Sequence, residues 1–101
     1  MLAALNNITT ADGYTLANTL PCEGAVKLNI EVSGAAIFYR YAIRDSLHPT
    51  GWAGATSNFG PEVFKGPNTY LLSRNADAVQ VRSAVPGKPA QVTIEALGPG
   101  E

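Results

Sequence analysis

The sequence predicts an all-β fold: an antiparallel β-sandwich or jelly-roll-like single domain with an extended N-terminal arm. Short runs in which apolar and polar residues alternate, as they do in half-buried strands, recur along the chain with glycine, proline, asparagine or aspartate between them. No apolar pattern keeps the helical period long enough to indicate an ordinary helix. Strands without covering helices bury their apolar faces by packing two sheets together.

The first twelve residues are expected to extend from the domain as an arm. Leu2, Leu5 and Ile8 provide its apolar side chains, while neighbouring asparagines and β-branched residues favour an extended chain over a helical turn. We therefore expect an arm over residues 1–12 and a β-sandwich domain over residues 13–101. The alternative is that this segment is an ordinary first strand, packed on its own domain.

Residues 77–97 are predicted to form a β-hairpin, because two alternating runs there flank a Pro-Gly pair. Proline sets the φ of the second position in a type II turn, and glycine accepts the positive φ of the third. If the two apolar faces lie on one side of the hairpin, opposed residue numbers sum to an odd value, and Val81 faces Ile94 or Val92.

A second hairpin is predicted for residues 25–32 and 35–44, joined at Ser33-Gly34. In its first strand, the residues expected to face the core are Val26, Leu28, Ile30 and Val32. In its second strand, Ile37, Tyr39, Tyr41 and Ile43 alternate with Phe38, Arg40, Ala42 and Arg44.

Shorter strands are predicted at residues 14–20, ended by Pro21, and at residues 62–64 and 69–74. Residues 45–61 lack periodicity and are expected to form a long loop, which is a common place for function. Trp52 and Phe59 in this region either anchor it on the core or contact a partner.

The composition favours a protein with a largely neutral surface. Charged residues make up 15% of the chain, against about 25% in a usual globular protein. Such a surface suits lasting contacts with other proteins, although stable monomeric β domains share it. The seven basic residues are scattered and the net charge is −1, which argues against nucleic-acid binding. With neither a membrane-spanning run nor a signal-peptide pattern, we expect synthesis in the cytoplasm and no membrane partner.

The residue types needed for catalysis or metal binding do not gather in the sequence. The single histidine, His48, lies beside Pro49 in the aperiodic region, and no serine lies in a Gly-x-Ser-x-Gly motif. Cys22 is the single cysteine, and a buried, inert thiol is the expected role. We therefore expect no enzyme activity, no catalytic or metal-binding residues and no cofactor.

The segments FGPEVFKGPNTYLLSR and AVQVRSAVPGKPAQVTIEAL resemble small accessory proteins encoded among the structural genes of tailed bacteriophages. The resemblance covers roughly the last forty residues, in a Val-Arg-Ser strand at residues 81–83, a Pro/Gly turn at residues 86–89 and an Ala-Gln-Val-Thr strand at residues 90–93. Capsid decoration or cement proteins of this kind are β-rich, non-enzymatic and often trimeric. They bind the major capsid protein from outside.

The resemblance implies a virion structural protein that stabilises a capsid from its surface, as a homo-oligomer and most simply a trimer. The residues expected to contact the capsid or a neighbouring subunit are Leu2, Leu5, Ile8, Trp52 and Phe59. The alternative is a carbohydrate- or ligand-binding β-sandwich module on a phage head fibre or tail. In that case Trp52, Tyr70 or Tyr14 would be platforms for sugar rings.

Overall fold

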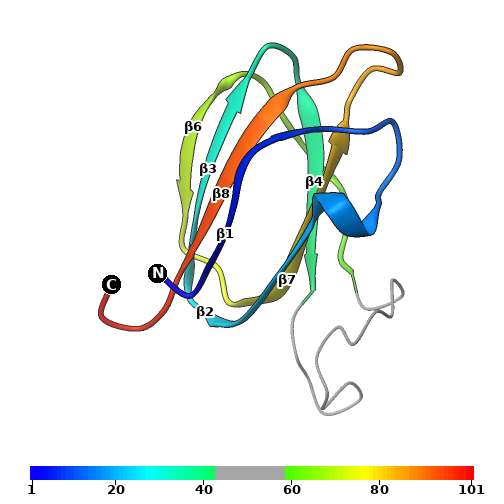
Figure 1. Ribbon diagram of the computed structural model, residues 1–101. Helices are drawn as coiled ribbons and strands as arrows, with labels where there is room; N and C mark the ends of the chain where they lie inside the picture. Colours follow the sequence, from blue (N-terminus) through cyan, green and yellow to red (C-terminus); the bar gives the residue numbers. More distant parts are fainter. Residues whose placement is uncertain (43–58) are drawn as a thin grey trace.

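The computed structural model describes residues 1–42 and 59–101. In these residues the chain forms two four-stranded antiparallel sheets that pack face to face, so the predicted β-sandwich is confirmed (Figure 1). The strands are β1 (Ala3–Thr9), β2 (Thr19–Ala25), β3 (Lys27–Ser33), β4 (Ile37–Ala42), β5 (Val63–Lys65), β6 (Asn68–Leu72), β7 (Ala76–Ser83) and β8 (Gln91–Leu97). A 3₁₀ helix, η1 (Leu16–Asn18), precedes β2. Sheet A has the order β1-β8-β3-β6, and sheet B has the order β2-β7-β4-β5.

The strand pairing is nested, and this makes the sandwich a jelly roll. β1 pairs with β8, β2 with β7, β3 with β6 and β4 with β5, as in one long hairpin folded on itself. The long hairpin is rolled up because β3 also pairs with β8 and β4 also pairs with β7. Strands that follow each other in sequence therefore mostly lie in opposite sheets, which is the jelly-roll arrangement.

The predicted terminal hairpin is wrong. β7 pairs with β2 and β4, whereas β8 pairs with β1 and β3, so Val81 has no ladder partner in β8. The local turn is nevertheless as predicted, with Gly87 at φ 78°. The Lys88 N–H donates to the Val85 carbonyl oxygen at 3.1 Å. The physical reason for the error is that both strands direct an apolar face at the same core, and they do so from opposite sheets.

The predicted hairpin of residues 25–32 and 35–44 is wrong for the same reason. β3 lies in sheet A and β4 in sheet B, and the chain crosses between the sheets at Gly34, whose φ is 87°. The inward faces were predicted correctly for Leu28, Ile30 and Val32 and for Ile37 and Tyr39, which are all buried. The prediction was wrong for Val26, which lies at the bend before β3 and is half-buried.

The N-terminal segment is a strand of the domain, not an arm. β1 pairs with β8 at the edge of sheet A. Directly after β1, the Thr10 N–H donates to the Ala90 carbonyl oxygen at 2.9 Å. A one-residue register shift between Leu5 and Ile8 is accommodated by Asn7, whose φ is 50°. The first-strand alternative thus describes this segment, and residues 1–12 do not separate from the sandwich.

The strand predicted for residues 14–20 lies later in the chain, as β2, and Pro21 is inside it. A proline fits there because β2 is an edge strand, where its missing N–H need not serve the ladder.

Between the two sheets lies one apolar core. Its largest fully buried aliphatic side chains are Leu28, Ile30, Val92 and Ile94 from sheet A and Ile37, Val79 and Val81 from sheet B.

Candidate binding face on the outer side of sheet B

The outer face of sheet B gathers aromatic and charged side chains in two rows. β4 and β7 pair with Phe38 opposite Arg82 and Arg40 opposite Gln80, and β5 adds Phe64 opposite Phe38. Because side chains alternate along a strand, Phe38 and Arg40 project away from the core that Ile37 and Tyr39 fill. The register of three strands therefore brings these outward residues together.

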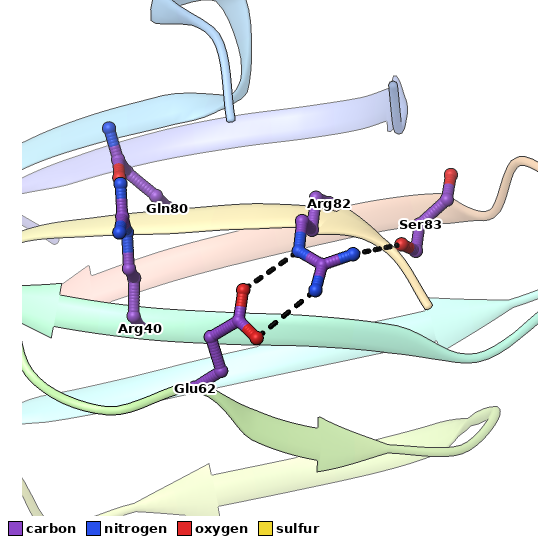
Figure 2. A network of polar contacts seen from close by, with 5 residues as sticks. All are labelled: Arg40, Glu62, Gln80, Arg82 and Ser83. Atoms are coloured by element: carbon purple, nitrogen blue, oxygen red, sulfur yellow. Dashed lines mark hydrogen bonds and ion pairs between the residues drawn. The ribbon is translucent and has the colours of Figure 1, made fainter. Parts of the chain in front are cut away.

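Arg82 and Glu62 form a bidentate ion pair on this face. The Arg82 Nε donates to Glu62 Oε1 at 2.8 Å and its Nη2 donates to Glu62 Oε2 at 3.0 Å (Figure 2). The Arg82 Nη1 also donates to the Ser83 carbonyl oxygen at 3.1 Å. Hydrogen bonding by Arg82 lowers the pKa of the Glu62 carboxyl. The pair therefore holds both charges in fixed positions.

Tyr14, from the segment between β1 and β2, lies against this face. The guanidinium carbon of Arg40 is 3.9 Å from the centre of its ring, and that of Arg82 is 5.7 Å away. Burial, and then the neighbouring Glu62 carboxylate, raise the pKa of Tyr14 to about 12. The Arg40 Nε donates to Gln80 Oε1 at 2.8 Å, and Gln80 is only 4% exposed.

Gln80 completes the link to the edge of sheet B, because its Nε2 donates to Thr19 Oγ1 at 3.0 Å. We call Tyr14, Arg40, Glu62, Gln80 and Arg82 the Tyr14 cluster. Its members come from four places in the sequence and hold the segment before β2 against β4 and β7. The cluster therefore makes the outer side of sheet B a rigid, partly covered surface.

Beside the Tyr14 cluster lies an exposed aromatic side chain. Phe64 is 59% exposed and meets Phe38 edge to face, with ring centres 5.7 Å apart. The Arg82 guanidinium lies 4.6 Å from the Phe38 ring centre. We call Phe38, Phe64 and the Glu62–Arg82 pair the Phe64 face. An apolar centre with a fixed polar rim is the common anatomy of a protein-binding surface.

The predicted contact residues lie in different places. Leu2 is 49% exposed, whereas Leu5 and Ile8 are partly buried and pack against the core of their own domain. Phe59 is half-buried near the Tyr14 cluster, with the Arg40 guanidinium 5.0 Å from its ring centre. Trp52 lies outside the described residues, as does His48. The structure therefore brings one predicted residue, Phe59, near the Tyr14 cluster.

The two described tyrosines that were considered as platforms for sugar rings each contact a basic side chain of the same chain. Tyr14 is covered by Arg40 as described above, and the Lys65 ammonium lies 4.7 Å from the centre of the Tyr70 ring. The Tyr70 hydroxyl donates to the Gly66 carbonyl oxygen at 2.7 Å, and its side chain packs against the core. Each ring therefore already contacts a basic side chain of its own chain.

Sequence reasoning missed Phe64 as a site residue. The available signal was alternation, which puts Phe38 on the outward side of its predicted strand. What could not be read was the register that places Phe64 beside it, because β4 and β5 are far apart in sequence.

Cys22 is buried as predicted, at 2% exposure, and its thiol lies 3.7 Å from the Ala76 carbonyl oxygen. Burial, and then the Asp77 carboxylate, raise the pKa of the thiol to about 12, so little reactive thiolate forms at neutral pH.

Among the residues that the structure describes, no helix is long and apolar enough to span a bilayer. Comparisons with protein-family models, curated proteins and solved structures gave no match.

Proposed function

We propose that this chain is a non-enzymatic structural protein of a tailed-bacteriophage virion. It decorates the capsid surface and stabilises the shell by binding the major capsid protein, and it acts as a homo-oligomer. The resemblance implies a trimer, because a protein bound at a threefold position can make three equivalent contacts there.

The observation that carries this proposal is the Phe64 face. A large aromatic side chain that is 59% exposed, supported by Phe38 and bordered by a fixed ion pair, suits a contact that buries an aromatic anchor in a protein pocket. Leu5 and Ile8 have no comparable exposure, because they pack inside the sandwich. We therefore assign the capsid contact to the outer side of sheet B.

A rigid surface is what a decoration protein needs. Its effect on the shell is the binding free energy of each copy, summed over many copies, and no chemical step is required. Because the Glu62–Arg82 pair and the Tyr14 cluster are formed within the chain, less side-chain freedom has to be lost when the partner binds.

The test uses heads of the phage that encodes the chain, purified without this protein. We expect the chain to sediment with these heads, and Phe64→Ala to weaken that binding by about tenfold or more, as for a hot-spot aromatic. Val85→Ala is the matched control, since Val85 is exposed but lies on the connection between β7 and β8. Failure of the unmodified chain to bind heads would contradict the proposal. Equal binding by the Phe64 variant would contradict the assignment of the face.

A further inference from the structure

The four edge strands of the two sheets differ in how well they can accept another strand. The edges of sheet A are β1 and β6, and those of sheet B are β2 and β5. The register of β1 shifts at Asn7, that of β2 shifts after Pro21, and β5 has three residues. Bulges, prolines and short lengths are devices that protect edges from pairing.

β6 has none of these devices. All five of its residues, from Asn68 to Leu72, pair with β3 in continuous register. In the described part of the chain, its other side pairs with no strand. Every residue from 66 to 73 is uncharged. β6 is therefore the edge at which strand addition is least hindered.

The backbone groups that β6 directs at its open edge can be identified. The Thr69 N–H donates to the side-chain Oδ1 of Asn68 at 2.8 Å, so it does not serve the ladder with β3. Backbone groups of alternate residues in an antiparallel strand point to the same side. The N–H and carbonyl of Leu71 therefore also point to the open edge, and the Leu71 side chain is 66% exposed.

We propose that β6 pairs with β6 of a second copy of this chain, antiparallel, about a twofold axis at Leu71. In this register each Leu71 donates its N–H to the carbonyl oxygen of the other Leu71, and the two exposed side chains lie next to each other. The two A sheets join into one continuous sheet. This inference does not depend on the proposed function.

Two features favour a second copy over a strand of another protein. The uncharged edge brings no like charges together when it meets its own copy, which is the usual penalty of self-pairing. The twofold axis also gives each copy the same two hydrogen bonds and the same apolar neighbour. Because such an isologous contact closes at two copies, the measured mass separates it from the trimer that the resemblance implies.

The first test is the mass of the purified chain by light scattering at micromolar concentration. We expect twice the 10.6 kDa of one chain. Leu71→Pro removes the proposed donor without touching the β3 ladder, and should give a folded monomer. Leu71→Ala keeps the N–H and should give a weaker dimer. A monomeric or trimeric unmodified chain, or a Leu71→Pro variant that remains dimeric, would overturn the proposal.

A second variant covers the case in which Leu71→Pro does not fold. Leu71→Cys should form a disulfide-linked dimer on mild oxidation, because directly paired strand residues lie within disulfide reach. Leu16→Cys is the control, since Leu16 is 79% exposed but lies in η1, away from the edge. Cys22 is buried and should not react. Equal crosslinking of the two variants would reject the β6 contact.

Discussion

The outer faces of the two sheets differ in how far their side chains are buried. In sheet A, β3 alternates buried residues with half-buried or exposed ones, and β8 does the same over its whole length. In sheet B, β7 is buried on both sides over most of its length, although Gln80 and Arg82 are polar. Sheet A is thus an ordinary half-buried sheet, whereas sheet B carries a second layer formed by the Tyr14 cluster.

This difference shows where the chain uses its polar groups for structure. A buried polar side chain is costly unless it is hydrogen-bonded, and Gln80 meets both Arg40 and Thr19. On sheet A the corresponding outer residues, such as Asn29 on β3, are only half-buried. Fixed polar groups beside an exposed aromatic occur on sheet B, which is why we place the partner contact there.

The largest expected effect comes from removing the edge of sheet A. Deletion of residues 1–10 removes β1, leaves β8 without its outer partner and deletes the buried Thr10–Ser83 hydroxyl contact of 2.7 Å. We expect the deleted chain to lose cooperative thermal unfolding, since the whole domain is held by about 5–15 kcal/mol. A deleted chain that melts like the full one would restore the arm hypothesis.

Truncation of one side chain in the core between the sheets should lower the free energy of unfolding by less than the deletion does, but still by a large part of the total. Ile30 and Ile94 are both 0% exposed, and replacing either with Ala leaves a cavity. We expect a loss of about 2–5 kcal/mol in the free energy of unfolding, measured by urea denaturation. Ile94→Val is the control and should cost about 0.5–1.5 kcal/mol. Equal losses for the two Ile94 variants would mean that the site collapses around the shorter side chain.

Core-facing residues could be predicted from the sequence, but strand pairing could not. Alternation places Val81 and Ile94 inward whether their strands are neighbours in one sheet or face each other across a core. The turn at Gly87 was equally ambiguous, because the same local geometry reverses a hairpin or carries the chain between sheets. Consecutive strands usually pair, and a jelly roll breaks that rule.

The candidate binding face was less predictable for the same reason. Phe64 and Phe38 become neighbours through the register of β4 and β5, and Tyr14 reaches Arg40 and Arg82 by folding back over sheet B. Each of these contacts joins segments that are distant in sequence. Residue patterns within one segment cannot reveal them, whereas the inward faces of single strands need no such knowledge.

Substitution of one outer residue on each sheet tests the comparison directly. Gln80→Ala on sheet B should lower the free energy of unfolding by about 1–3 kcal/mol, because Arg40 and Thr19 lose a buried partner. Asn29→Ala on sheet A should change it by about 0.5 kcal/mol or less, as for most surface substitutions. Similar values from chemical denaturation would mean that the second layer on sheet B adds no stability.

The Tyr14 hydroxyl should make stability fall at high pH. Its folded pKa is raised to about 12 from an ordinary value of 10.0, so folding favours the neutral phenol. The contribution is fully present below pH 10.0 and is lost as the pH rises toward about 12. Burial also raises the pKa of Tyr39. Absorbance titration should therefore show more than one tyrosine that ionises late, and Tyr14→Phe should lack one of them. An unchanged titration in that variant would place the late tyrosines elsewhere.

The smallest expected effect concerns acid and the Glu62–Arg82 pair. Its partner Arg82 holds the folded pKa of Glu62 below its ordinary value of 4.5, so folding favours the carboxylate. A lowered pKa gives a contribution that is present above 4.5 and is lost as the pH falls through the folded value. Thermal unfolding measured between neutral and acidic pH should therefore be less acid-sensitive in Glu62→Gln than in the unmodified chain.

Glu31→Gln, which removes an exposed carboxylate from the outer side of sheet A, is the matched control. Because the pair is at the surface, added salt should reduce the difference between the unmodified chain and Glu62→Gln. If the two glutamine variants respond to acid alike, the ion pair beside Phe64 is no more fixed than a charge on sheet A.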